Sequence, residues 1–192
     1  DHDVVPDSPT NNFATFSPLV LDDFTLSQGN LKATSEVAQL GMLTSTISCK
    51  GQKFYCEIRV DVVGNGTLVG IVKSSHGGTR SYNLAQLFSL YYSFGGAVYK
   101  FQSATGDTFA SYTAGDVIGM AIDGINGTIQ FFKNGSLQGT ITEATIATED
   151  YLIYCANATT SGGNSSTFTA NFGQDSSFAG SETIANNTDS NG

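Results

Sequence analysis

The chain has no tryptophan, two histidines and only eight basic residues, and these shortages exclude several classes of function. Seventeen acidic residues outnumber the eight Lys and Arg, which gives a formal net charge of −9. Because phosphate binding needs clustered Lys and Arg, neither nucleic acid nor an anionic membrane surface is expected as a partner. No apolar run approaches the roughly 18 residues of a membrane-spanning helix, so we expect no membrane insertion.

The scarcity of histidine also limits catalysis. His2 lies in a polar leading segment and His76 in a loop rich in Ser and Gly, and no G-x-S-x-G elbow accompanies either residue. A Ser-His-Asp nucleophile is therefore not indicated. No cluster of His and Cys has metal-ligand spacing, so we expect neither a metal nor another cofactor.

Cysteine is also scarce, and an odd count of three means that at least one thiol is unpaired. Cys56 and Cys155 lie in apolar runs, where free cysteine typically behaves as a small buried hydrophobe. The sequence does not decide whether Cys49 forms a disulfide with Cys56 or Cys155.

The residues that are plentiful are Ser, Thr, Asn and Gly, which replace charged residues; the charged share is 13% against an average of about 25%.

The segment Lys53–Asp61 alternates between apolar and mostly polar side chains. Phe54, Cys56, Ile58 and Val60 share one face, and Tyr55, Glu57, Arg59 and Asp61 share the other, which predicts a half-buried strand. The nearly continuous apolar run Leu68–Val72 predicts a strand in the middle of a sheet.

The most informative segment runs from Gly115 to Thr140 and predicts two hairpins in succession. Strands are expected at 117–122 and 128–133, separated by turn residues at 123–127. Asn134-Gly135 then forms a two-residue turn, because both residues tolerate the positive φ of a type I′ turn.

This segment resembles the GDxIGxxxDxxxGxxxFxxNGxxxG signature of SPRY domains, and three further pieces follow the SPRY order. They are Gly51–Val60, similar to the early strand; Val69–Val72, similar to the VGV strand; and the terminal Asn171-Phe172-Gly173. Two features depart from the family: Phe54 and Cys56 stand where tryptophan is usual, and no PPxG strand follows the exit.

The resemblance implies an all-β fold, an antiparallel two-sheet sandwich of the jelly-roll or concanavalin A-like type. We expect an N-terminal arm or linker at 1–12, the sandwich at 13–175 and a polar tail or linker at 176–192. The segments Asp7–Leu19, Leu26–Leu31 and Asn171–Gly180 resemble the flanks of SPRY-like modules in bacteriophage virion and tail proteins. That likeness predicts a domain at a virion surface or outside the cell, excised from a longer chain.

SPRY domains are recognition modules, so the resemblance implies a non-catalytic binder of a host-surface glycan, a protein or a neighbouring virion subunit. SPRY ligands contact loops at one side of the sandwich, where aromatic rings supply contact area. The residues expected to contact the ligand are His76, Arg80, Tyr91, Tyr92 and Phe94.

Two alternatives stay open. The concanavalin-like sandwich also hosts glycoside hydrolases, which need two carboxyl groups in a cleft, and Glu57 and Asp61 share a strand face. Arg59 between them favours an exposed face of alternating charge, and a neighbouring positive charge opposes the retained proton of a general acid. The other alternative is a eukaryotic-type SPRY adaptor that binds proteins.

Overall fold

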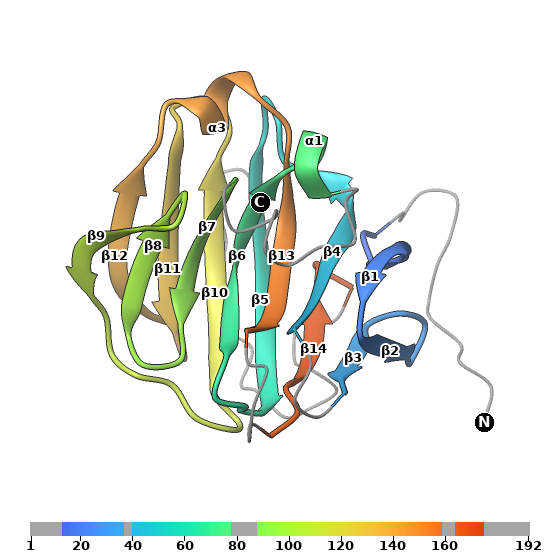
Figure 1. The fold of residues 1–192 in the computed structure, drawn as a ribbon. Helices are drawn as coiled ribbons and strands as arrows, with labels where there is room; N and C mark the ends of the chain where they lie inside the picture. Colours follow the sequence, from blue (N-terminus) through green and yellow to red (C-terminus); the bar gives the residue numbers. More distant parts are fainter. Residues whose placement is uncertain (1–12, 37–39, 78–87, 159–163, 175–192) are drawn as a thin grey trace.

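The computed structural model describes residues 13–36, 40–77, 88–158 and 164–174, and two antiparallel sheets contain nearly all of their regular structure (Figure 1). The first sheet has the order β1 (Phe16–Asp22), β4 (Leu40–Ser48), β13 (Tyr151–Ala158), β6 (Thr67–Lys73), β7 (Ser89–Ser93), β8 (Ala97–Lys100), β9 (Ser103–Thr108). The second has the order β12 (Ser136–Thr142), β11 (Thr128–Lys133), β10 (Val117–Asp123), β5 (Lys53–Val62), β14 (Thr167–Asn171), β3 (Lys32–Ser35), β2 (Phe24–Ser27). Two single-turn helices, α1 (Ser74–Gly77) and α3 (Thr145–Thr148), lie in connections. The predicted antiparallel sandwich is confirmed.

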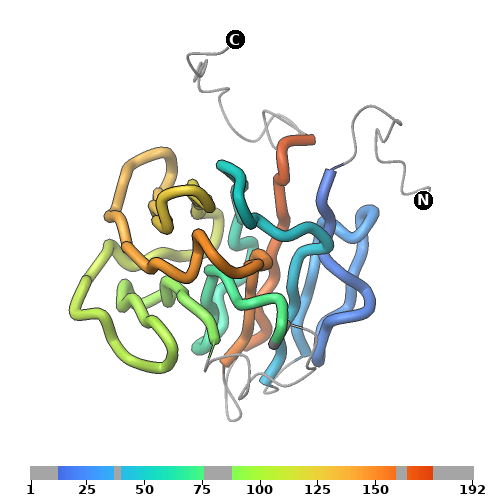
Figure 2. The backbone as a smooth tube through the Cα atoms, turned by 90° about the horizontal axis from the view of Figure 1, so that it is seen from above, coloured from blue at the N-terminus to red at the C-terminus, as the bar shows by residue number. Residues whose placement is uncertain are grey.

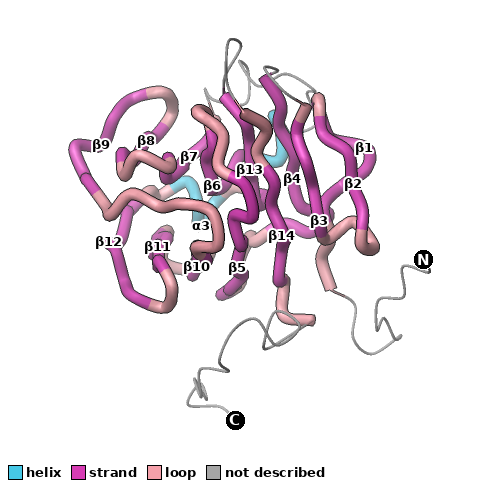
Figure 3. The backbone as a smooth tube through the Cα atoms, turned by 90° about the horizontal axis from the view of Figure 1, so that it is seen from below, coloured by secondary structure: helices cyan, strands magenta, loops and turns pink. Residues whose placement is uncertain are grey.

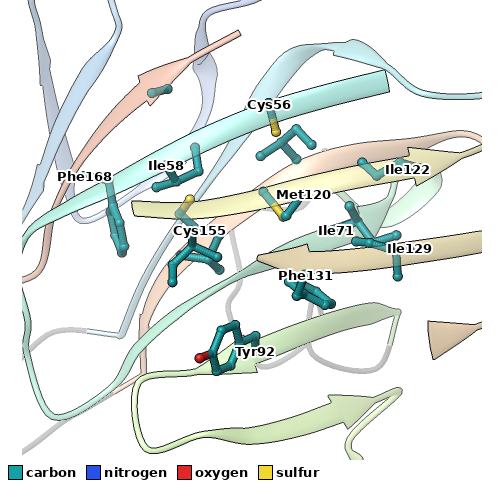
Figure 4. Close-up of a cluster of buried hydrophobic side chains, with 14 of the residues drawn as sticks. Cys56, Ile58, Ile71, Tyr92, Met120, Ile122, Ile129, Phe131, Cys155 and Phe168 are labelled. Atoms are coloured by element: carbon teal, nitrogen blue, oxygen red, sulfur yellow. The ribbon is translucent and has the colours of Figure 1, made fainter. Parts of the chain in front are cut away.

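The main core lies between the sheets and is built from alternate residues of each strand. Cys56, Ile58 and Val60 of β5 are fully or almost fully buried there, as the alternation in 53–61 predicts. Figure 4 shows side chains of both sheets meeting in this layer: Cys56, Ile58, Met120, Ile122, Ile129, Phe131 and Phe168 from the second, with Ile71, Tyr92 and Cys155 from the first. Apolar burial of this extent is what holds the two sheets together.

The three cysteines are all free and buried, with at most 2% of each exposed. Burial raises the pKa of Cys49 to about 12, with a further contribution from the Asp150 charge, and it raises the pKa of Cys155 as well. Since a thiol with a raised pKa is neither a nucleophile nor a metal ligand at neutral pH, these residues pack as small hydrophobes.

The outer face of the first sheet is buried as well. A second cluster of buried side chains lies there: Met42, Leu68, Val72, Tyr91, Tyr154 and Ala156. Both faces of β6 are therefore inside the protein, which explains the unbroken apolar run in its sequence. The prediction that β6 occupies a middle position is confirmed, because it pairs with β13 and β7.

The two predicted hairpins are present. β10 pairs with β11 up to Asp123 opposite Thr128, and β11 returns as β12 through Asn134-Gly135. Both turn residues have positive φ, 48° and 76°, as a type I′ turn requires. Backbone N–H groups of Ile125 and Asn126 donate to Asp123 Oδ1, both at 2.9 Å, so this aspartate closes the first turn.

Strand β14 lies between β3 and β5, so strands from opposite ends of the described chain are neighbours (Figure 3). The sheet edges are formed by β1 and β9 in the first sheet and by β12 and β2 in the second. Seen from above, the edges β9 and β12 lie at one side of the sandwich and the blue N-terminal strands at the other (Figure 2).

Candidate interaction face

The structure places the predicted ligand residue Tyr92 in the core rather than on a loop surface. Tyr92 lies in strand β7 with none of its surface exposed. Its ring packs edge-on against Phe109, Tyr112 and Phe131, and its hydroxyl donates to the carbonyl of Ala110. The expectation that this ring stacks on a ligand is corrected, because both faces of the ring are already covered.

Tyr91 is buried on the other side of the same strand, in the second cluster, with 6% exposed. It stacks on Tyr99 with a centroid separation of 5.2 Å, so this ring also has no face free for a ligand. Phe94 follows in the β7–β8 turn, partly buried against the main core. Its N–H donates to the carbonyl of Thr67.

The other two predicted contact residues are not placed in detail. His76 lies in α1, but its side chain is outside the described structure, as is the whole of Arg80. Their role in ligand binding stays a prediction.

A different surface has the character of a binding face: the outer side of the second sheet. Part of this surface is formed by the side chains of β5 that the sequence predicts to face outward. At one end of the strand, Asp61 accepts hydrogen bonds from Thr169 Oγ1 at 2.6 Å and Arg59 Nε at 2.7 Å, and Lys32 Nζ lies 3.5 Å away. Burial alone would raise the pKa of Asp61, but these hydrogen bonds and positive charges outweigh it and lower the pKa.

This environment bears on the glycosidase alternative. A general acid must hold its proton near neutral pH, whereas Asp61 is kept ionised by its partners. Glu57 lies four residues away on the same strand, which separates the two Cα atoms by roughly 13 Å. Glycosidase carboxyl groups lie about 5–9 Å apart. Both carboxylates are engaged in hydrogen bonds on this face.

At the other end of β5, Tyr55 leans across the neighbouring strand. Its hydroxyl donates to Glu57 Oε1 at 2.9 Å, and burial together with the charge of Glu57 raises the pKa of the phenol. A Cβ built on Gly119 of β10 would lie 2.7 Å from the Tyr55 Oη and 3.2 Å from the Phe132 Cβ. The missing side chain at 119 is thus what lets the Tyr55 ring cross β10.

Beyond Gly119 the Tyr55 ring meets Phe132 of β11 edge-on, at a centroid separation of 6.3 Å. Phe132 is paired in register with Leu137 of β12. We call Tyr55, Phe132 and Leu137 the apolar ridge. Tyr55 is 49% exposed, Leu137 is 54% exposed, and Phe132 is partly exposed. The ridge ends at the free edge of the sheet.

The basic side chains around the ridge are ion-paired. Each of the seven described Lys and Arg residues lies within 4.0 Å of a carboxylate: Lys32, Lys50, Lys53, Arg59, Lys73, Lys100 and Lys133. Glu57, beside the ridge, has no ion pair with a basic side chain in the described ranges. Cationic side chains are neutralised across the described surface while some carboxylates are not.

No group of three His, Cys, Asp or Glu in the described parts of the chain could hold a metal ion. None of the helices that the structure describes is long and apolar enough to cross a bilayer.

Two antiparallel sheets packed around a common core define the class of β-sandwich domains. The SPRY domain model matches residues 53–175, which is more than half of the chain, so the protein belongs to the SPRY domain family. SPRY domains are generally non-catalytic modules of protein interaction.

Solved structures show the same fold at low sequence identity. The SPRY domain of human HERC1 aligns with a TM-score of 0.68 at 20% identity, covering 83% of this chain and 99% of that one. The TRIM65 PSpry domain aligns with a TM-score of 0.65 at 13% identity, covering 83% and 90%. Stonustoxin aligns with a TM-score of 0.59 at 16% identity, over 82% of this chain and 28% of the toxin chain. None of the curated proteins matches the chain.

The sequence did not reveal the ridge, because its three residues come from three strands. The alternation along β5 predicts that Tyr55 faces outward, but the polar residues beside it indicate only a solvated face. The available signal was Gly119 within an otherwise β-rich run, since an isolated glycine in a strand often marks the close approach of another group.

Proposed function

We propose that this SPRY domain is a non-catalytic protein-recognition module whose contact surface is the apolar ridge. The observation that carries the proposal is the alignment of Tyr55, Phe132 and Leu137 across adjacent strands, with half of Tyr55 and Leu137 exposed. Tyrosine is enriched among the residues that dominate binding energy at protein interfaces. A contiguous apolar patch on a polar surface supports an interaction site.

The Tyr55 ring is held ready for contact before a partner arrives. Its hydroxyl is fixed by Glu57 and its edge by Phe132, so little rotamer freedom is lost on binding. Ordering a flexible side chain costs about 0.5–1.5 kcal/mol, and a ring already fixed avoids most of that cost. The other large exposed hydrophobics, Leu19, Ile47, Val62 and Ile125, lie at scattered places on β1, β4, the end of β5 and the β10–β11 turn.

The assignment to a virion or extracellular surface, and the binding of a glycan or a virion subunit, rest on the resemblance of the flanking sequences. They stay predictions of the sequence. The proposal made here concerns a protein partner, as does the eukaryotic-adaptor alternative.

The test is selection of binders from a random-peptide library displayed on its encoding nucleic acid, followed by affinity measurement. We expect Tyr55→Ala and Leu137→Ser each to weaken the selected peptides at least about tenfold. Ile125→Ser is the matched control, because this side chain is at least as exposed as the ridge residues and lies in the β10–β11 turn outside the ridge. A library that yields no binders, or binders indifferent to both ridge substitutions, overturns the proposal.

A further inference from the structure

The ridge leads directly to strand β12, the free edge of the second sheet. A free edge presents unpaired backbone groups, and proteins usually protect it with proline, charge or a short strand. β1, at an edge of the other sheet, contains Pro18 and Asp22, β9 contains Asp107, and β2 has four residues. β12 has seven residues, Ser-Leu-Gln-Gly-Thr-Ile-Thr, with no proline and no charge. Its one irregularity is a bulge, between Phe131 and Phe132 in the register with β11.

The ladder pattern identifies which backbone groups of β12 face outward. Residues of an antiparallel pair alternate between hydrogen-bonded and non-hydrogen-bonded positions. At a non-hydrogen-bonded position the backbone N–H and C=O point away from the neighbouring strand. The two-residue turn makes Lys133 and Ser136 a hydrogen-bonded pair, so the backbone groups of Leu137 face outward.

On the other side of the bulge the same alternation applies. The N–H of Glu143 donates to the carbonyl of Gly127 at 2.9 Å, so Thr140 and Thr142 fall at outward positions. No described backbone group outside the sheet pairs with β12. Beside this edge, the N–H of Ala110 donates to the side chain of Gln138, and the Phe109 ring lies close to Gly139.

We propose that the partner recognised by the ridge enters as an extended segment of another protein, adds a strand to β12, and is neutral or basic. This inference rests on the proposed function and adds the binding mode to it. Strand addition derives affinity from main-chain hydrogen bonds and specificity from alternate side chains. Here Leu137 contributes both, because its backbone faces the free edge and its side chain ends the ridge.

The preference for a neutral or basic segment follows from charge. The edge strand itself carries no charge, and the described Lys and Arg side chains are all ion-paired. The carboxylate of Glu57, beside Tyr55, accepts hydrogen bonds from Tyr55 and Asn171 but has no basic partner among the described residues. A second copy of this chain would bring another net charge of −9 to the same edge, and like charges in close contact oppose association.

The experiment uses the selected peptides and methylates their backbone amides one at a time. If the peptide pairs with β12, methylation of alternate amides weakens binding at least about tenfold and methylation of the others leaves it unchanged. Thr140→Pro in the protein removes one outward N–H and should weaken binding similarly. Thr140→Val keeps that N–H and is the control.

The outcomes separate the two proposals. Peptides that need Tyr55 but show no alternation on methylation overturn strand addition and leave the ridge in place. Absence of any ridge-dependent peptide overturns both. A concentration-dependent dimer that Thr140→Pro abolishes identifies a second copy as the occupant and overturns the partner proposed here. If Thr140→Pro fails to fold, the series of methylated peptides still tests whether the peptide pairs with β12.

Discussion

The side-chain amide of Asn134 donates a 2.7 Å hydrogen bond to Asp116 Oδ1, and so joins two residues of the signature segment that are 18 positions apart. Asn134 Oδ1 also accepts from the N–H of Val117 at 2.8 Å. Asp116 in turn accepts from the N–H of Thr113 at 2.7 Å, and Lys133 Nζ lies 3.1 Å from its carboxylate. The aspartate and asparagine of the motif therefore fasten the start of β10 to the β11–β12 turn.

We expect this fastening to be measurable as a coupling energy. Asn134→Gly keeps a residue suited to positive φ but removes both hydrogen bonds of the side chain, which should destabilise the domain by about 1–2 kcal/mol. Combined with Asp116→Ala in a double-mutant cycle measured by urea unfolding, the two substitutions should couple by about 1 kcal/mol. Additive effects would show that the contact contributes nothing to stability.

Acid should weaken the domain progressively. Burial opposes ionisation of Asp61, Asp116 and Glu143, yet hydrogen bonds and nearby Lys or Arg lower their pKa values below 3.8 for the aspartates and 4.5 for the glutamate. For Asp123, hydrogen bonds from Asn126 are the main cause of the lowered pKa. A carboxylate with a lowered native pKa stabilises the fold above its unfolded pKa, and this stability is lost as the pH falls through the native value.

The urea midpoint should accordingly stay level near neutrality and decline between about pH 5 and pH 2. The Asp61→Asn side chain is not protonated in this range, so the urea midpoint of that variant should decline less steeply than that of the parent chain. A urea midpoint that stays constant down to about pH 2 would contradict the conclusion that these carboxylates have lowered pKa values in the native state.

Gly119→Ala should damage the ridge more than the fold. The added Cβ meets the far end of Tyr55, which can swing away, and the Phe132 Cβ, which can move little. Overpacking of this kind costs about 1–3 kcal/mol, and the displaced ring loses its place across β10. Peptide binding should fall as it does in Tyr55→Ala. Gly95→Ala is the control, because nothing lies within 4 Å of its added Cβ; equal binding by both variants would refute the positioning role of Gly119.

The cysteines should resist alkylation in the native protein. All three are buried, and burial raises the pKa of Cys49 to about 12, so little thiolate is available near neutral pH. Intact-mass measurement should find no iodoacetamide adduct on the folded chain and three adducts after denaturation without a reductant. Fewer than three would reveal a disulfide, and adducts on the folded chain would reveal an accessible thiol.

The parts of the fold that could be predicted from the sequence are those that depend on residues close together in the chain. Asn134-Gly135 specifies its own turn, and alternation along β5 states which residues face the core. The sequence shows two tyrosines in succession at 91 and 92 but not what covers each side of the strand, so the loop surface expected there is absent and both rings are buried. Burial of both faces of the first sheet depends on contacts between distant segments.

The interaction face escaped prediction for the same physical reason. Tyr55, Phe132 and Leu137 become neighbours only through strand register, which a one-residue slip would change completely. The chemistry of each residue was visible in the sequence, whereas their adjacency depends on pairing across β10.

The position of β14 between β3 and β5 also determines when the domain can form during synthesis. The β2–β3 pair is made early, yet its only neighbour within the sheet is β14, which begins at Thr167. A nascent chain released or stalled before that residue leaves β5 with an unpaired edge and the first hairpin detached from its sheet. Because pairing between distant segments is slow and leaves surfaces open to aggregation, ribosome-bound chains of this length should depend on chaperones until β14 emerges.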